Sequence, residues 1–140
     1  MVIKKLLGHK VLLALLILYT IIITWASLAR LIIPFKVGVQ GSDKIGHCVA
    51  YFIFTLLWFL FFFFSEIKNK NFKQSLLSSS VICFFFGALM ELLQMFLTNY
   101  RSPDWYDVIA NTSGIVFVVM LLKGFERKLL VLKHKIHTLS

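Results

Sequence analysis

Four long apolar stretches fill most of this chain, and no other feature restricts its fold as strongly. They run over residues 11–33, 45–64, 76–97 and 105–122. A helix needs about 20 apolar residues to cross the hydrocarbon core of a bilayer, and each stretch is close to that length. Because no room remains for a separate soluble domain, we predict a single all-α domain over residues 1–140, a polytopic bundle of about four transmembrane helices.

The balance of apolar and charged residues supports a membrane setting. The chain is 59% hydrophobic and only 15% charged, whereas a soluble domain is near half apolar and about a quarter charged. A net charge of +9 would suggest nucleic acid binding in a soluble protein. Here the basic residues lie in short pieces between apolar stretches, where they meet membrane lipids. We therefore expect no nucleic acid partner. A homo-oligomer stays open, because a bundle this small could pair with copies of itself.

The C-terminal tail has a pattern of its own. Residues 123–140 carry five lysines and arginines. Phe125, Leu129, Leu132 and Ile136 recur at helical spacing within this basic segment. Apolar residues on one face of a basic helix are typical of a helix that lies in the membrane interface. The sequence therefore predicts a basic amphipathic C-terminal helix.

The second apolar stretch ends in a run of phenylalanines, Phe59 and Phe61 to Phe64. In a soluble protein such a run would be an aggregation hazard, but lipid tails solvate aromatic rings well. We expect these rings to face lipid.

The distribution of basic residues predicts the topology, because cytoplasmic loops of membrane proteins carry an excess of lysine and arginine. Eleven of the fifteen basic residues lie in the N-terminal segment, in the loop over residues 65–73 and in the tail. These segments are separated by even numbers of apolar stretches, so they lie on the same side of the bilayer. We predict that both termini are cytoplasmic and that the other connections face outward.

Polar residues gather on the outward side in three of the four stretches. On each stretch they recur every three or four positions, and such residues are neighbours on a helix surface. Ionisable groups at membrane depth normally face the bundle interior or a wet cavity. We therefore expect the three polar stripes to face one another and to form an outward-facing polar pocket. The candidate ligand-binding residues are Asp43, Lys44, His47, Tyr51, Glu91, Gln94, Arg101, Asp104, Asp107 and Asn111.

Two classes of function fit this pocket. In the first, the protein binds a ligand without catalysis: Lys44 and Arg101 meet a phosphate or carboxylate, and the acidic residues meet amines or hydroxyls. In the second, His47, Glu91 and Asp107 are catalytic residues of a membrane-embedded hydrolase or metal-dependent enzyme acting on a lipid-linked substrate. Polar residues also hold transmembrane helices together, which is a purely architectural alternative.

The spacing of the residues favours binding over catalysis. No cysteine or serine is paired with His47 at a recognised spacing, and no zinc-binding signature is present. We therefore expect no metal and no other cofactor. One distance separates the hypotheses. Direct coordinating distance between His47, Glu91 and Asp107 would favour a metal or catalytic site, and carboxylates that are all paired would favour binding or architecture.

Three pieces of the chain also match a known pattern in order and in spacing. They are Asp43-Lys44-Ile45-Gly46-His47 with Tyr51, then Gly87 with Glu91 and Gln94, and then Arg101 with Asp104, Asp107, Asn111 and Gly114. Over roughly residues 40–118 the chain resembles the VanZ-like family. The resemblance implies a small multi-pass protein of the bacterial cytoplasmic membrane. The founding member of the family is associated with low-level resistance to teicoplanin, a glycopeptide with a lipid tail. A glycopeptide or a cell-wall precursor is therefore the partner that the resemblance implies.

Overall fold

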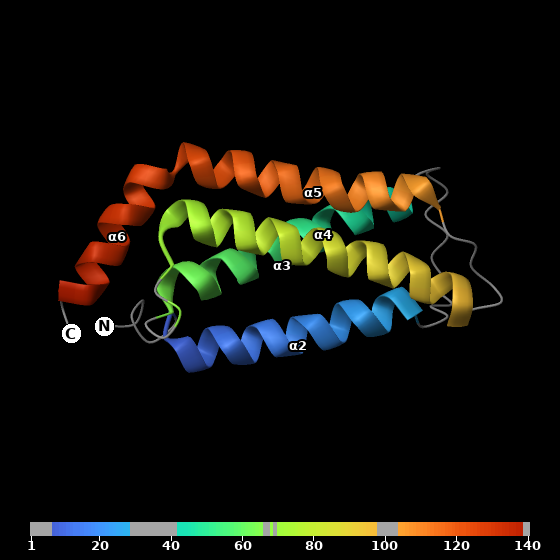
Figure 1. Ribbon diagram of the computed structural model, residues 1–140, viewed down its shortest axis with the longest axis horizontal. Coiled ribbons are helices and arrows are strands. Elements are labelled where there is room, and N and C mark those ends of the chain that lie inside the picture. Colours follow the sequence, from blue (N-terminus) through green and yellow to red (C-terminus); the bar gives the residue numbers. More distant parts are fainter. Residues whose placement is uncertain (1–6, 29–41, 66–67, 69, 98–103, 139–140) are drawn as a thin grey trace.

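The computed structural model describes residues 7–28, 42–65, 68, 70–97 and 104–138, and this part of the chain is almost entirely helical (Figure 1). Its helices are α2 (His9–Leu28), α3 (Ser42–Phe64), α4 (Phe72–Leu97), α5 (Trp105–Gly124) and α6 (Glu126–Thr138). The first four of these are long and apolar enough to cross a membrane. The structure thus confirms the predicted all-α fold of four transmembrane helices followed by a C-terminal helix.

The observed helices extend beyond the apolar stretches at ends where polar side chains cap them. α4 begins at Phe72, four residues before the predicted stretch. Just before it, the backbone N–H of Gln74 donates to Asn71 Oδ1 over 2.8 Å, and the Asn71 N–H donates to Gln74 Oε1 over 3.3 Å. This reciprocal pair is a capping box, which makes a polar first turn stable as helix. The predicted end of the first stretch, at residue 33, lies outside the described residues.

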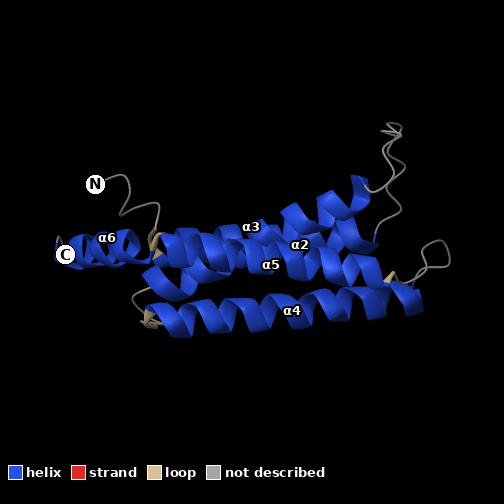
Figure 2. Cartoon of the chain, turned by 90° about the horizontal axis from the view of Figure 1, so that it is seen from above, coloured by secondary structure: helices blue, strands red, loops and turns tan. Residues whose placement is uncertain are grey.

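Helix α3 is the centre of the bundle. It packs most extensively against α5, and it also contacts α4 and α2. The helices run antiparallel in sequence order, so the beginning of α2, the end of α3 and the end of α5 lie at one end (Figures 1 and 2). We call this end, which α6 follows, the basic end. The beginnings of α3 and α5 and the end of α4 lie together at the other end, which we call the polar end.

The phenylalanine run lies inside the protein, so the prediction that it faces lipid is wrong. Phe59 and Phe61 to Phe64 are each at most 6% exposed. Phe59 stacks on Phe63 with 5.2 Å between ring centroids, and Phe72 of α4 meets both rings edge-on. The protein encloses this end of α3, and a helical segment that is apolar all round belongs in such a place. The rings therefore form the core at the basic end.

Helix α6 docks on that core. Leu129, Leu132 and Ile136 pack against the buried cluster. Lys133 donates from Nζ to the carbonyl oxygen of Lys70 over 3.0 Å, and its ammonium lies 4.6 Å from the centroid of the Phe63 ring. Burial lowers the pKa of the Lys133 ammonium. The tail is thus the amphipathic helix that its spacing predicts, and part of its apolar face covers protein.

Gly114 brings the backbones of α3 and α5 into contact near the middle of α5. A Cβ atom at Gly114 would overlap the carbonyl oxygen of Cys48 and would lie 2.9 Å from the backbone nitrogen of Phe52. Real Cβ atoms do not approach backbone atoms that closely, so only glycine permits this packing. The contact holds the first turns of α5 against the first turns of α3, where the polar residues lie.

Candidate functional site

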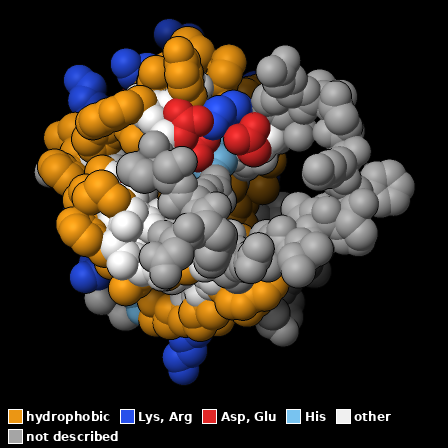
Figure 3. Space-filling view, turned by 90° about the vertical axis from the view of Figure 1, so that its right-hand side faces the viewer, with side chains coloured by type: hydrophobic (Ala, Val, Ile, Leu, Met, Phe, Trp, Pro, Cys, Tyr) orange, Lys and Arg blue, Asp and Glu red, His pale blue; other side chains and the backbone are white. Residues whose placement is uncertain are grey.

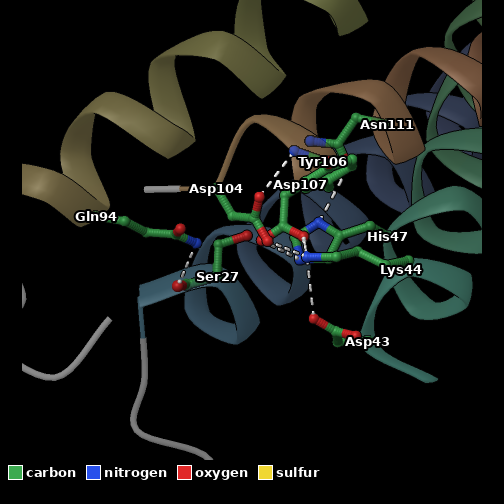
Figure 4. Close-up of polar contacts among 9 residues, drawn as sticks. All are labelled: Ser27, Asp43, Lys44, His47, Gln94, Asp104, Tyr106, Asp107 and Asn111. Carbon is green, nitrogen blue, oxygen red and sulfur yellow. Dashed lines mark hydrogen bonds and ion pairs between the residues drawn. The ribbon is translucent and has the colours of Figure 1, made fainter. Parts of the chain in front are cut away.

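The polar stripes predicted on three helices meet at the polar end of the bundle. The space-filling view of this end shows acidic side chains beside a basic one, with a histidine beneath them (Figure 3). Hydrophobic side chains surround this group. α3 contributes its first turns, α4 its last turns, and α5 its N-cap and first turns (Figure 4). The described residues of this site are Asp43, Lys44, His47, Glu91, Asp104, Asp107 and Asn111.

Lys44 is the hub of the outer part of the site. Its ammonium lies 2.5 Å from Asp104 Oδ2, 2.5 Å from Asp107 Oδ1 and 3.2 Å from Asp43 Oδ2. The side chain of Asp107 is only 3% exposed, and a buried carboxylate needs such a cation nearby. The ion pairs join α3 to α5, and we call Asp43, Lys44 and Asp104 the outer ion-pair cluster.

The helix ends favour these carboxylates. Asp104 is the N-cap of α5, and its Oδ1 accepts from the backbone N–H of Tyr106 over 2.9 Å. Asp107 lies in the first turn of the same helix, and Asp43 in the first turn of α3. Negative charge is stabilised at helix N-termini, where unpaired N–H groups and the helix dipole point outward. Two helix N-termini at one end thus help to hold three acidic residues close together.

The inner part of the site lies around His47. Nδ1 of His47 lies 3.0 Å from Asn111 Oδ1, and Nε2 lies 3.6 Å from Asp107 Oδ2. An amide oxygen only accepts hydrogen bonds, so Nδ1 carries the proton in this arrangement. His47, Glu91 and Asp107 each offer one potential ligand atom, and these atoms all lie within 4.8 Å of one another. We call these three residues the inner triad.

Two of the predicted site residues have contacts of another kind. The side-chain amide of Gln94 donates to the backbone carbonyl of Ser27 over 2.9 Å, which ties α4 to the end of α2. Tyr51 is 2% exposed and meets the Phe54 ring edge-on. Its hydroxyl oxygen would lie 3.3 Å from a Cβ at Gly87, so that glycine makes room for it. The contact between Gln94 and Ser27 could not be predicted from the sequence, because the acceptor is a backbone carbonyl, which every residue has.

Arg101 lies outside the described residues. Among the described ones the site holds four carboxylates, one lysine and one histidine. Glu91 is 6% exposed. It comes from α4, whereas the residues of the outer ion-pair cluster come from α3 and from the N-cap of α5. The site is therefore acidic in the part that the structure describes.

The distances support both of the opposing hypotheses, each in a different part of the site. Lys44 engages Asp43, Asp104 and Asp107, as expected for binding or architecture. The inner triad converges from three helices, as expected for a metal or catalytic site. Asp107 belongs to both groups of contacts. A structural outer part and a chemically active inner part are therefore compatible.

Comparison with known proteins identifies the family. A sequence profile of the VanZ/LLP1 family matches residues 7–130, which is most of the chain. The chain belongs to the VanZ/LLP1 family. The match includes all four membrane-spanning helices and the polar end, so the resemblance carried by the three motifs is confirmed. This VanZ/LLP1 protein is a multi-pass membrane protein.

A relative outside bacteria also matches. The chain is similar to an uncharacterized protein, C11E3.10, of the fission yeast Schizosaccharomyces pombe, with 32% identity over 81 residues. The matched region covers 57% of this chain and 46% of the relative, so it spans about half of the yeast protein. No solved structure matches the chain significantly. Membership of the VanZ/LLP1 family therefore does not by itself imply a bacterial origin.

Proposed function

We propose that this protein binds the polar head of an amphipathic, lipid-linked ligand at the polar end of its bundle. The observation that carries the proposal is the convergence of six ionisable side chains from three helices at one end of a membrane-spanning bundle. Holding four helices together does not require so many charges, since small residues and single polar contacts suffice. The acidic balance of the described residues favours ligand amines, hydroxyls or a bound cation.

A shallow, open depression along one face of α2 is compatible with a ligand that has a lipid tail. It has a volume of about 560 Å³ and is lined by Thr20, Ile21, Thr24, Trp25 and Leu28. Both threonine hydroxyls donate to backbone carbonyls of their own helix, so they add little polarity to the depression. Leu28 of this lining follows Ser27 in the chain, and the Ser27 carbonyl accepts from Gln94 of α4. An acyl chain in this depression would lead toward the polar end.

The setting that we propose is a bacterial cytoplasmic membrane, with both termini cytoplasmic and the polar end facing outward. The basic end carries α6 and the lysines of the α3–α4 connection, which agrees with the excess of positive charge in cytoplasmic segments. In that orientation the ligand would be a cell-wall precursor or a teicoplanin-like glycopeptide, and binding would contribute to antibiotic resistance. The yeast relative favours a ligand class that is not limited to bacteria, such as a lipid-linked head group.

Glycopeptide sensitivity and membrane accumulation together test this proposal. Glu91→Gln and His47→Ala are each expected to abolish any protection against a teicoplanin-like glycopeptide while the protein accumulates normally in the membrane. Both side chains belong to the inner triad, and Glu91→Gln preserves shape while removing the charge. His134→Ala is the matched control, because it removes an exposed histidine of α6. Protection that survives both inner-triad substitutions would contradict the proposal.

Hydrolysis of a lipid-linked ester is the second candidate function. The observation in its favour is that the inner triad lies within 4.8 Å, a distance at which one water could contact all three side chains. In the tautomer in which Nδ1 donates to Asn111, Nε2 of His47 would take a proton from this water. The reaction would be measured as phosphate or alcohol released from lipid-linked esters in vesicles. Turnover by the unmodified protein and none by Glu91→Gln is the expected result, and equal release by both would exclude this role.

A further inference from the structure

We infer that the inner triad binds one divalent transition-metal ion, with His47 Nε2, an Asp107 oxygen and a Glu91 oxygen as its protein ligands. The inference goes beyond ligand binding and does not depend on which head group the protein recognises. It rests on the convergence of the three side chains, on the direction of the His47 ring and on the residues that support His47 and Asp107.

The His47 ring presents a lone pair to a carboxylate. Nδ1 lies 3.0 Å from Asn111 Oδ1, and in the tautomer that donates to this oxygen Nε2 carries the lone pair. Nε2 lies 3.6 Å from Asp107 Oδ2, which is too long for a hydrogen bond. Two ligands bound to one ion at about 2.1 Å lie roughly 3.0–3.5 Å apart. The gap between these two atoms is slightly longer than this range, so a small approach of the two side chains would let both bind one cation.

Each of these two ligands is held from behind by another residue. Metal-binding histidines usually donate their other N–H to an oxygen, which fixes the ring orientation, and Asn111 does this for His47. Metal-binding carboxylates are usually hydrogen-bonded in turn, and Lys44 binds Oδ1 of Asp107 over 2.5 Å. Lys44 thus takes one oxygen of Asp107 while the other oxygen faces the ring. This arrangement is typical of a prepared metal site.

A buried hydroxyl lies beneath the triad. Tyr51 is one helical turn below His47 on α3, and its hydroxyl is buried without a hydrogen-bond partner among the described residues. The same hydroxyl lies beside Gly87, one turn before Glu91 on α4. Side chains on a helix lean toward its N-terminus, so in these antiparallel helices Tyr51 and Glu91 lean toward each other. A water or an anion on the ion would give this buried hydroxyl an acceptor.

The kind of side chain at the triad also suits a cation. Two of its three members are buried carboxylates, Glu91 and Asp107, and the third is an imidazole. Carboxylate oxygen and imidazole nitrogen are ligands of cations, not of anions.

The ligand set indicates the kind of ion. Imidazole nitrogen suits Zn²⁺ and other transition metals, and carboxylate oxygen suits Mn²⁺ as well. Ca²⁺ and Mg²⁺ prefer oxygen alone. Three protein ligands would leave a position open for water or for an oxygen of the head group, as in catalytic zinc sites. The ion would then replace His47 as the group that activates water.

Metal titration of the full chain in lipid nanodiscs tests the inference. After chelation and dialysis, the protein is titrated separately with ZnCl₂ and MnCl₂, and bound metal is counted by elemental analysis. We expect one ion per chain. Glu91→Gln and His47→Ala are expected to weaken binding more than 100-fold, and Asn111→Ala about 10- to 100-fold, because Asn111 only orients the ring. Electron paramagnetic resonance of bound Mn²⁺ reports the loss of the nitrogen ligand in His47→Ala.

The control and the contrary outcomes are defined by the same titration. His134→Ala removes an exposed histidine on α6 and is expected to bind as the unmodified protein does. Circular dichroism of each variant shows whether its helices are intact. The inference is overturned if the folded, unmodified protein binds neither ion stoichiometrically, or if His47→Ala binds with unchanged affinity. Neither result would contradict head-group binding, which is measured separately.

Discussion

Alanine at position 114 is expected to destabilise the folded protein by about 3 kcal/mol, the upper range for overpacking a tight interface. The added Cβ would overlap the Cys48 carbonyl and crowd the Phe52 nitrogen. These are backbone atoms of a helix, so they cannot rotate away as a side chain does. α3 and α5 must therefore separate, and their packing is the most extensive in the bundle. Denaturant titration in detergent micelles, followed by circular dichroism, measures the free energy of unfolding.

Gly124→Ala is the matched control for this substitution. Gly124 is the last residue of the same helix, and a Cβ there would have no atom within 4 Å. Alanine is favoured over glycine in helices by up to about 1 kcal/mol, so this variant should be unchanged or slightly more stable. Equal stability of the two alanine variants would show that the backbone contact at Gly114 does not limit the packing.

Replacing Lys44 by methionine is expected to destabilise the protein by about 3 kcal/mol, the lower end of the range for breaking a buried ion pair. The substitution keeps the length of the side chain but removes the ammonium that contacts Asp43, Asp104 and Asp107. Asp107 would remain buried without this cation. The lower end of the range applies because the Lys44 side chain is 30% exposed and water can partly replace it. The same denaturant titration measures the effect.

A double-mutant cycle separates the lost ion pair from lost packing. Asp107→Asn removes the buried charge, so Lys44→Met should cost less in that background than alone. Lys68→Met is the control for the loss of a lysine, because Lys68 is exposed at the basic end. Its effect should stay within about 0.5 kcal/mol. Strict additivity of Lys44→Met and Asp107→Asn would mean that their contact does not stabilise the fold.

Most of the architecture could be predicted because two constraints act together. A bilayer requires long apolar helices, and a helix places residues three or four positions apart on one face. His47, Glu91 and Asp107 could therefore be assigned to one site from their spacing and depth. Residue spacing gave no sign of a metal, because the proposed ligands come from three separate helices.

The burial of the phenylalanine run could not be predicted for a physical reason. Lipid tails are as apolar as a protein core, so hydropathy does not distinguish a ring that faces lipid from one that faces another helix. The hydrogen-bond partners of individual side chains could not be predicted from the sequence for a related reason. Gln94 donates to the Ser27 carbonyl, and Lys44 donates to Asp104 and Asp107, which lie 60 and 63 positions away in the sequence. Such choices depend on how each helix is rotated about its axis.

The close approach at Gly114 also sets the axial offset between α3 and α5. Each residue advances a helix by 1.5 Å and turns it by about 100°, so slipping by one position would rotate Asp107 away from Lys44 and Asn111 away from His47. Gly114 lies two turns below Asp107 on the same rigid helix. The distances within the site therefore depend on a buried contact outside the site. A substitution at this glycine should therefore change the distances between the side chains at the polar end, although none of those residues is itself substituted.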